Sequence, residues 1–69
     1  MITDIRLNEE SVDILARLCQ EYRYGLLFDC ECFVVIASEN GWPLDKWLEA
    51  RDRDVNVAVL QMAIKAGIK

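Results

Sequence analysis

The sequence predicts an all-α domain, a compact bundle of three to four short helices. Three observations favour this class. Apolar residues at helical spacing follow a helix start signal at residue 8, and a second such pattern covers residues 53–66. Within residues 22–38, where a β-hairpin would need its tight turn, no Asn-Gly or Asp-Gly pair separates two strands. The 69 residues suit one domain, 1–69, of the size at which a single core is only marginally stable.

The first predicted helix begins after Asn8, whose side chain can cap a helix N-terminus. Two glutamates follow in the first turn, and Leu7 with Val12 has the spacing of a hydrophobic staple. We expect Gly25 to end this helix in a left-handed cap. The apolar residues share one broad face of the helix: Val12, Ile14, Leu15, Leu18, Cys19 and Tyr22.

Residues 22–37 allow two interpretations. Apolar side chains recur at every second residue from Tyr22 to Ile36. This pattern indicates a strand or hairpin and therefore an α+β fold. The other interpretation is a helix from Asp29 to Asn40, with Asp29 as its N-cap and Gly41 just past its end. We favour the helix because the turn residues of a hairpin are missing, and the α+β fold remains the alternative.

A Gly-Trp-Pro break at residues 41–43 separates this segment from a short third helix over residues 43–51. Proline disfavours helix at the residue before it and suits the first helical turn itself. The apolar residues of the third helix lie at i, i+3, i+4 spacing: Leu44, Trp47 and Leu48.

The final helix, over residues 53–66, is apolar around most of its circumference. We expect Asp52 or Asp54 to start it and Gly67 to close it. One apolar face comprises Val55, Val59, Met62, Ala63 and Ala66, and a nearly opposite flank comprises Val57, Leu60 and Ile64. A chain of this length has few other elements to cover such a helix, so we expect part of it to meet another protein chain.

Two tryptophans complete the predicted protein interface. Large aromatic residues are enriched both in cores and at interface hot spots. The helical spacing of Trp47 favours the core, whereas Trp42 fits either place. The predicted interface comprises Trp42, Trp47, Val57, Leu60 and Ile64.

Residues 36–50 carry a second candidate motif. Ala37, Gly41 and the apolar pair Trp47 and Leu48 are spaced as in a helix-turn-helix, and the segment is similar to that of small DNA-binding regulators. The resemblance implies a recognition helix after the turn. The basic residues that would then contact nucleic acid are Lys46, Arg51 and Arg53.

Charge argues against this nucleic-acid interpretation. The chain has 12 acidic and 8 basic residues, a formal net charge of −4. Three carboxylates, Asp45, Glu49 and Asp52, would lie on the recognition helix, although phosphate contacts dominate the affinity of such helices for DNA.

Catalysis has little support in the sequence. The chain has no histidine to act as a general base and no Gly-rich phosphate loop. Cys19, Cys30 and Cys32 are odd in number and predict reduced, buried thiols rather than a disulfide framework or a zinc site. We therefore predict no catalytic residue, no metal, no cofactor and no small-molecule substrate.

The first residues lack the pattern of a secretion signal, and no apolar run is long enough to cross a bilayer, so we expect a cytoplasmic protein without membrane association. The predicted function is a small, non-catalytic regulatory or protein–protein interaction module that pairs with a partner protein or with itself as a homodimer through its C-terminal helix. One alternative is the helix-turn-helix regulator. The other is a small acidic inhibitor, of the phage or mobile-element type, that blocks a basic nucleic-acid-binding partner.

Overall fold

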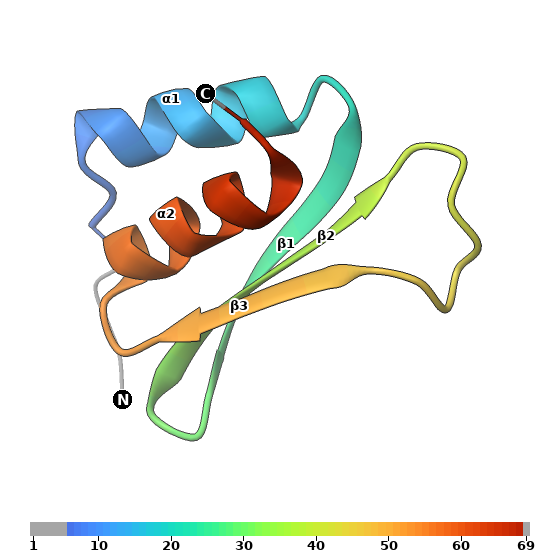
Figure 1. The fold of residues 1–69 in the computed structure, drawn as a ribbon. Helices are drawn as coiled ribbons and strands as arrows, with labels where there is room; N and C mark the ends of the chain where they lie inside the picture. The colour runs from blue at the N-terminus through green and yellow to red at the C-terminus, as the bar shows by residue number, and fades with distance from the viewer. Residues whose placement is uncertain (1–5, 69) are drawn as a thin grey trace.

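The computed structural model describes residues 6–68 and shows two helices and a three-stranded antiparallel sheet (Figure 1). The elements in chain order are α1 (Glu9–Leu18), β1 (Tyr22–Asp29), β2 (Cys32–Glu39), β3 (Leu48–Asp52) and α2 (Val55–Ala66). The strand order is β1-β2-β3, so β2 is central and β1 and β3 are the two edges. The predicted all-α helical bundle is therefore wrong, and the chain adopts the α+β alternative.

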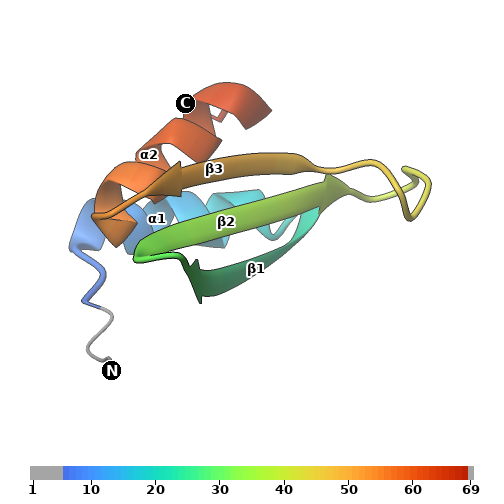
Figure 2. The same cartoon turned by 90° about the horizontal axis from the view of Figure 1, so that it is seen from below.

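Both helices pack on one face of the sheet, and the core lies between these two layers. Leu18 of α1, Val35 of β2 and Met62 of α2 are fully buried in this core. Figure 2 looks onto the opposite face of the sheet, which neither helix covers. We call it the open face. Its residues in register across the three strands are Gly25, Ile36 and Glu49 in one row and Leu27, Val34 and Arg51 in the next.

The start of α1 agrees with the sequence, but its end does not. The Asn8 side chain accepts a hydrogen bond from the Ser11 N–H at 2.8 Å, which confirms the predicted N-cap. The helix ends at Leu18, and Gly25 lies inside β1 rather than at a helix terminus. The residues predicted to share one helix face therefore belong to different elements, because Tyr22 is the first residue of β1.

Helix α2 has both predicted caps. The Asp54 carboxylate accepts the Asn56 N–H at 2.8 Å, and Gly67 ends the helix with a left-handed φ of 75°. The Asn56 carboxamide also joins the two helices, because its oxygen accepts the Asn8 N–H at 2.9 Å and the Ser11 hydroxyl at 2.7 Å. This polar link satisfies the fully buried Ser11 side chain.

The predicted helix from Asp29 to Asn40 is wrong because these residues form a hairpin turn and β2. Asp29 pairs with Cys32, and the two residues between them, Cys30 and Glu31, turn the chain with φ angles of 52° and 63°. Left-handed angles at both positions are those of a type I′ hairpin turn, which usually contains Asn or Gly. The expected turn chemistry is absent, yet the chain makes the turn with ordinary residues.

The predicted helix over residues 43–51 is also wrong. Residues 40–47 connect β2 to β3, and Leu48–Asp52 pair with β2. Leu48 and Ala50 point to the core at period two, so the i, i+3, i+4 spacing with Leu44 has no helical meaning here. Residues 36–50 contain no helix, and the helix-turn-helix interpretation loses its structural basis.

Candidate protein-interaction surface

The open face carries apolar side chains without a helix to cover them. Val34 is only 3% exposed there, and its register neighbours Leu27 and Arg51 lie on either side of it. Long side chains of this kind cover apolar neighbours with their stems while their ends stay in water. Leu27 itself is 52% exposed. Val34 is therefore buried on a face that neither helix covers, beside the more exposed side chains of Leu27 and Arg51.

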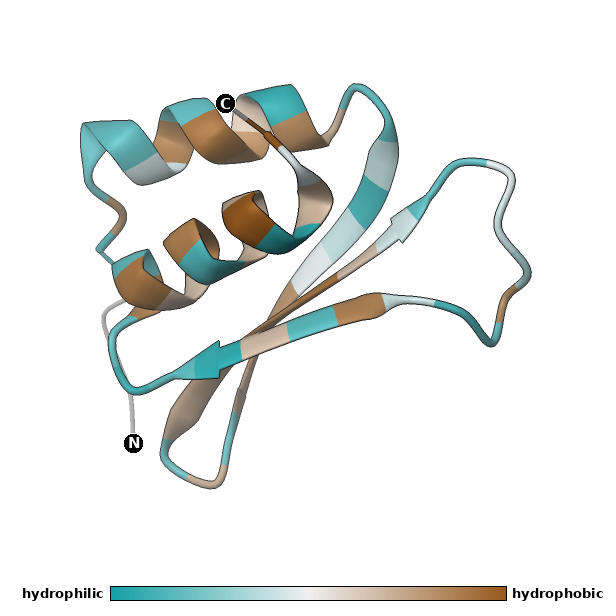
Figure 3. Cartoon of the chain, in the orientation of Figure 1, coloured by the Kyte–Doolittle hydropathy of each residue, from teal (hydrophilic) through white to brown (hydrophobic). Residues whose placement is uncertain are grey.

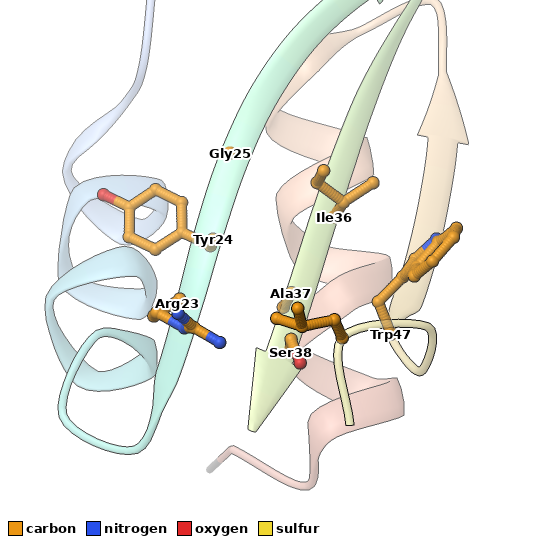
Figure 4. A pocket seen from close by; sticks show the side chains of 8 residues that line it. Arg23, Tyr24, Gly25, Ile36, Ala37, Ser38 and Trp47 are labelled. Carbon is orange, nitrogen blue, oxygen red and sulfur yellow. The ribbon is translucent and has the colours of Figure 1, made fainter. Parts of the chain in front are cut away.

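A groove of about 370 Å³ crosses one end of this face. Its apolar walls are Ile36, Leu44 and Trp47, and Gly25 contributes bare backbone. Figure 4 shows the Trp47 ring on one side of Ile36 and Gly25 on the other. Leu44 is 86% exposed and Trp47 52% exposed, so the prediction that Trp47 joins the core is wrong.

The loop before β3 holds these two side chains beside the sheet. The Ser38 hydroxyl donates a hydrogen bond to the Lys46 carbonyl at 3.0 Å, which ties the loop to the end of β2. On the same loop, the Lys46 ammonium lies 4.4 Å from the centre of the Trp42 ring. The loop therefore has internal contacts that position Trp47 at the groove.

Trp42 lies at the same end of the sheet but packs within the chain. Its ring meets Tyr22 edge to face, with ring centres 5.9 Å apart. Burial, and then the Glu39 carboxylate paired with this residue across the strands, raise the pKa of Tyr22 above its ordinary value. Trp42 is half-buried, so its contacts are mainly structural.

Gly25 has no obvious structural requirement inside the chain. It lies within a strand and is not among the glycines with positive φ. A Cβ at this position would meet Ile36 Cγ1 at 3.6 Å, an ordinary van der Waals contact. Glycine weakens a strand interior and often marks a place where another molecule approaches the backbone.

The basic residues of the DNA interpretation lie in three different places. Lys46 is in the loop, Arg53 is exposed in the connection to α2, and Arg51 is on the open face of β3. The Arg51 Nε donates to Glu49 at 2.8 Å, and this carboxylate raises the pKa of the guanidinium further above its usual value. Arg51 also lies 3.9 Å from Asp29. Arg51, which was expected to contact DNA phosphates, thus pairs with two carboxylates of its own chain.

The predicted interface residues do not form one surface. Val57, Leu60 and Ile64 face away from the sheet on α2, whereas Trp47 is on the open face. Ile64 is 80% exposed, but Leu60 is only 38% exposed. Sequence reasoning missed Gly25, Ile36 and Leu44, and the signal that could have found them was a glycine inside the alternating apolar pattern.

Residues 6–68 contain no group of three or more histidine, cysteine or acidic side chains arranged to hold a metal ion. Cys19 and Cys30 are exposed and Cys32 is half-buried, so the prediction that the three thiols are buried is wrong. Over the same residues, neither helix combines the length and apolar character that a membrane span needs. Comparison with protein-family models, curated proteins and solved structures found no match to this chain.

Proposed function

We propose that the chain is a non-catalytic protein-interaction module that binds an apolar side chain of a partner protein in the groove of the open face. The observation that carries this proposal is the pair Leu44 and Trp47, held largely exposed beside the bare backbone of Gly25. Exposed apolar patches of this kind mark interaction sites, because a soluble protein gains nothing from leaving them in water.

The shape of the groove supports a protein ligand over a small molecule. It lies on the surface of a sheet, and its lining is mainly aliphatic and aromatic. A small-molecule site usually encloses most of its ligand and adds several convergent polar groups. Tryptophan is among the residue types that most often dominate binding between proteins, and Trp47 forms one wall of this groove.

A peptide library provides the test. Peptides selected on the wild-type chain should share an aliphatic or aromatic residue, and the Trp47→Ala variant should bind them at least about 10-fold more weakly, as expected for a hot spot. In a Trp42→Phe background, the fluorescence of Trp47 reports binding directly. Leu60→Ala, on the far side of the molecule, is the matched control and should bind as wild type. Equal binding by wild type and Trp47→Ala would overturn the proposal.

A further inference from the structure

Strand β1 presents a free edge to solvent. The Asn40 N–H donates to the Glu21 carbonyl at 2.8 Å, one step beyond the β1–β2 register. Hydrogen-bonded pairs recur at every second residue of an antiparallel ladder, so this bond fixes which backbone groups face β2. The N–H and C=O groups that face away belong to Tyr24, Leu26 and Phe28. Within residues 6–68, no other element donates to or accepts from them.

Two side chains along this edge are exposed as well, whereas Leu26 between them packs against the core. Tyr24 and Phe28 lie on the helix side of the sheet, yet they are 40% and 52% exposed. In Figure 2, β1 forms the margin of the sheet and neither helix lies beyond it. Figure 4 shows the Tyr24 ring on the outer side of β1, away from Ile36. A long, apolar, unprotected edge is a template for pairing with another strand.

We propose that two copies of this chain pair through β1, antiparallel, about a twofold axis that passes between their Leu26 residues. The two Leu26 residues then exchange backbone hydrogen bonds. In this register, Arg23 of each copy stands opposite Asp29 of the second copy, Tyr24 opposite Phe28, and Gly25 opposite Leu27.

Each of these facing pairs is complementary. Arg23 is exposed, and it makes no ion pair among the described residues. Asp29 accepts a long hydrogen bond from the Cys30 thiol at 3.6 Å and makes a single, long ion pair of 3.9 Å with Arg51. Cross-strand pairs of opposite charge and of two aromatic rings both stabilise antiparallel sheets. The small Gly25 leaves room for the exposed Leu27 side chain on the open face, which gives a reason for a glycine that the single chain does not need.

Neighbouring registers lose this complementarity. A twofold axis at Gly25 would set Arg23 opposite Leu27, and an axis at Leu27 would set Gly25 opposite Asp29. Neither places the two charges together. An axis at Leu27 would set Arg23 opposite Glu31, which lies in the turn outside β1, so the axis at Leu26 is the register in which opposite charges of the paired strands meet.

The dimer would form one six-stranded sheet, because each copy contributes three strands and β1 joins β1. Side chains of facing residues point to the same side of a sheet. Both open faces therefore lie on one side, and all four helices lie on the other. This inference goes beyond the proposed function, and the two share Gly25, which lines the groove and would also face Leu27 of the second copy.

A charge exchange tests the pairing and its register together. Light scattering on a sizing column should show the wild-type chain as a concentration-dependent dimer. Arg23→Asp and Asp29→Arg should each weaken the dimer about 10-fold or more, because the axis presents each altered pair twice. The double variant should return to within about threefold of wild type. Arg53→Asp carries the same charge change at a distant exposed site and should leave the dimer unchanged.

A second variant tests the edge without using charge. Tyr24→Pro removes an N–H that faces solvent, so it should keep the β1–β2 ladder and abolish the dimer, whereas Tyr24→Ala should only weaken it. Circular dichroism shows whether each variant is folded. The proposal is overturned by a wild-type chain that is monomeric at every concentration, by a double variant no tighter than the single ones, or by a folded Tyr24→Pro dimer. It is also overturned if Leu60→Asp on α2 dissociates the dimer and Tyr24→Pro does not.

Discussion

The two edge strands of this sheet are protected very differently. β3 has five residues, three of them charged, and the Lys65 ammonium of α2 donates to the outward Glu49 carbonyl at 2.6 Å. β1 has eight residues, and Figure 3 shows that its second half is apolar, whereas β3 is largely polar. Short length, charge and a covering element are the usual protections of a strand edge. β3 has all three, and β1 is the edge left available for pairing.

The largest effect is expected when the protection of β3 is removed. The variant Glu49→Val, Arg51→Val, Lys65→Met gives β3 an apolar edge with a free Glu49 carbonyl. Each copy would then have two pairing edges, and association should pass from a closed dimer to open chains. Light scattering should show masses well above the dimer. Glu49→Val, Arg51→Val with Lys65 retained is the control, and we expect it to stay at the dimer because α2 still covers the carbonyl.

Both edges depend on β2 between them, and adjacent valines of β2 allow a test of its two faces. Val35 is fully buried under the helices, so Val35→Ala should lower the free energy of unfolding by about 2 kcal/mol through lost contacts and the cavity left behind. Val34→Ala should cost about half as much, because Leu27 and Arg51 on the open face can close over the gap. Urea unfolding followed by tryptophan fluorescence measures both. Equal losses would show that the open face is packed as rigidly as the core.

The turn that joins β1 to β2 should be improvable. Cys30 and Glu31 both have left-handed φ angles, which cost an ordinary residue about 1 kcal/mol each. Cys30→Asn with Glu31→Gly installs the residues that prefer this turn and should raise the free energy of unfolding by about 1 kcal/mol. Residues 40 and 41 are already Asn and Gly, so they offer no matching control. Cys19→Asn, at the exposed end of α1, is the control instead, and it should not raise the free energy of unfolding. No gain in the turn variant would mean that the hairpin carries little strain.

This turn also explains why the sequence predicted helices where strands formed. The start of α1 and both ends of α2 were readable because Asn8, Asp54 and Gly67 act on their own local backbone. The hairpin has no such local signal, since β pairing holds Cys30 and Glu31 in angles they disfavour. Central β2 is apolar on both faces, from Phe33 to Ala37, and such a run resembles a buried helix.

The apolar residues at every second position do lie in strands, but those of β1 and those of β2 lie on opposite faces of the sheet. On β1 the even-numbered residues face the helices, whereas on β2 the odd-numbered residues Val35 and Ala37 do so. The predicted run from Tyr22 to Ile36 therefore passed from the helix side to the open face at the turn. The groove was missed for the same reason, because Ile36 and Gly25 become neighbours only through the strand register. Such pairing between distant residues is not contained in any local window of sequence.

The smallest expected effect is a change in the pKa of Tyr22, the first residue of β1. Burial and the paired Glu39 carboxylate raise the pKa of Tyr22, so the folded state favours the neutral phenol. Its contribution to stability is complete below about pH 10 and is lost as the pH rises through the raised pKa. In a Tyr24→Phe background, Glu39→Gln should lower the titration midpoint of Tyr22, read from absorbance at 295 nm, without removing the shift that burial causes. An unmoved midpoint would show that Glu39 does not contribute to the raised pKa, which would leave burial and the Glu21 carboxylate as its causes.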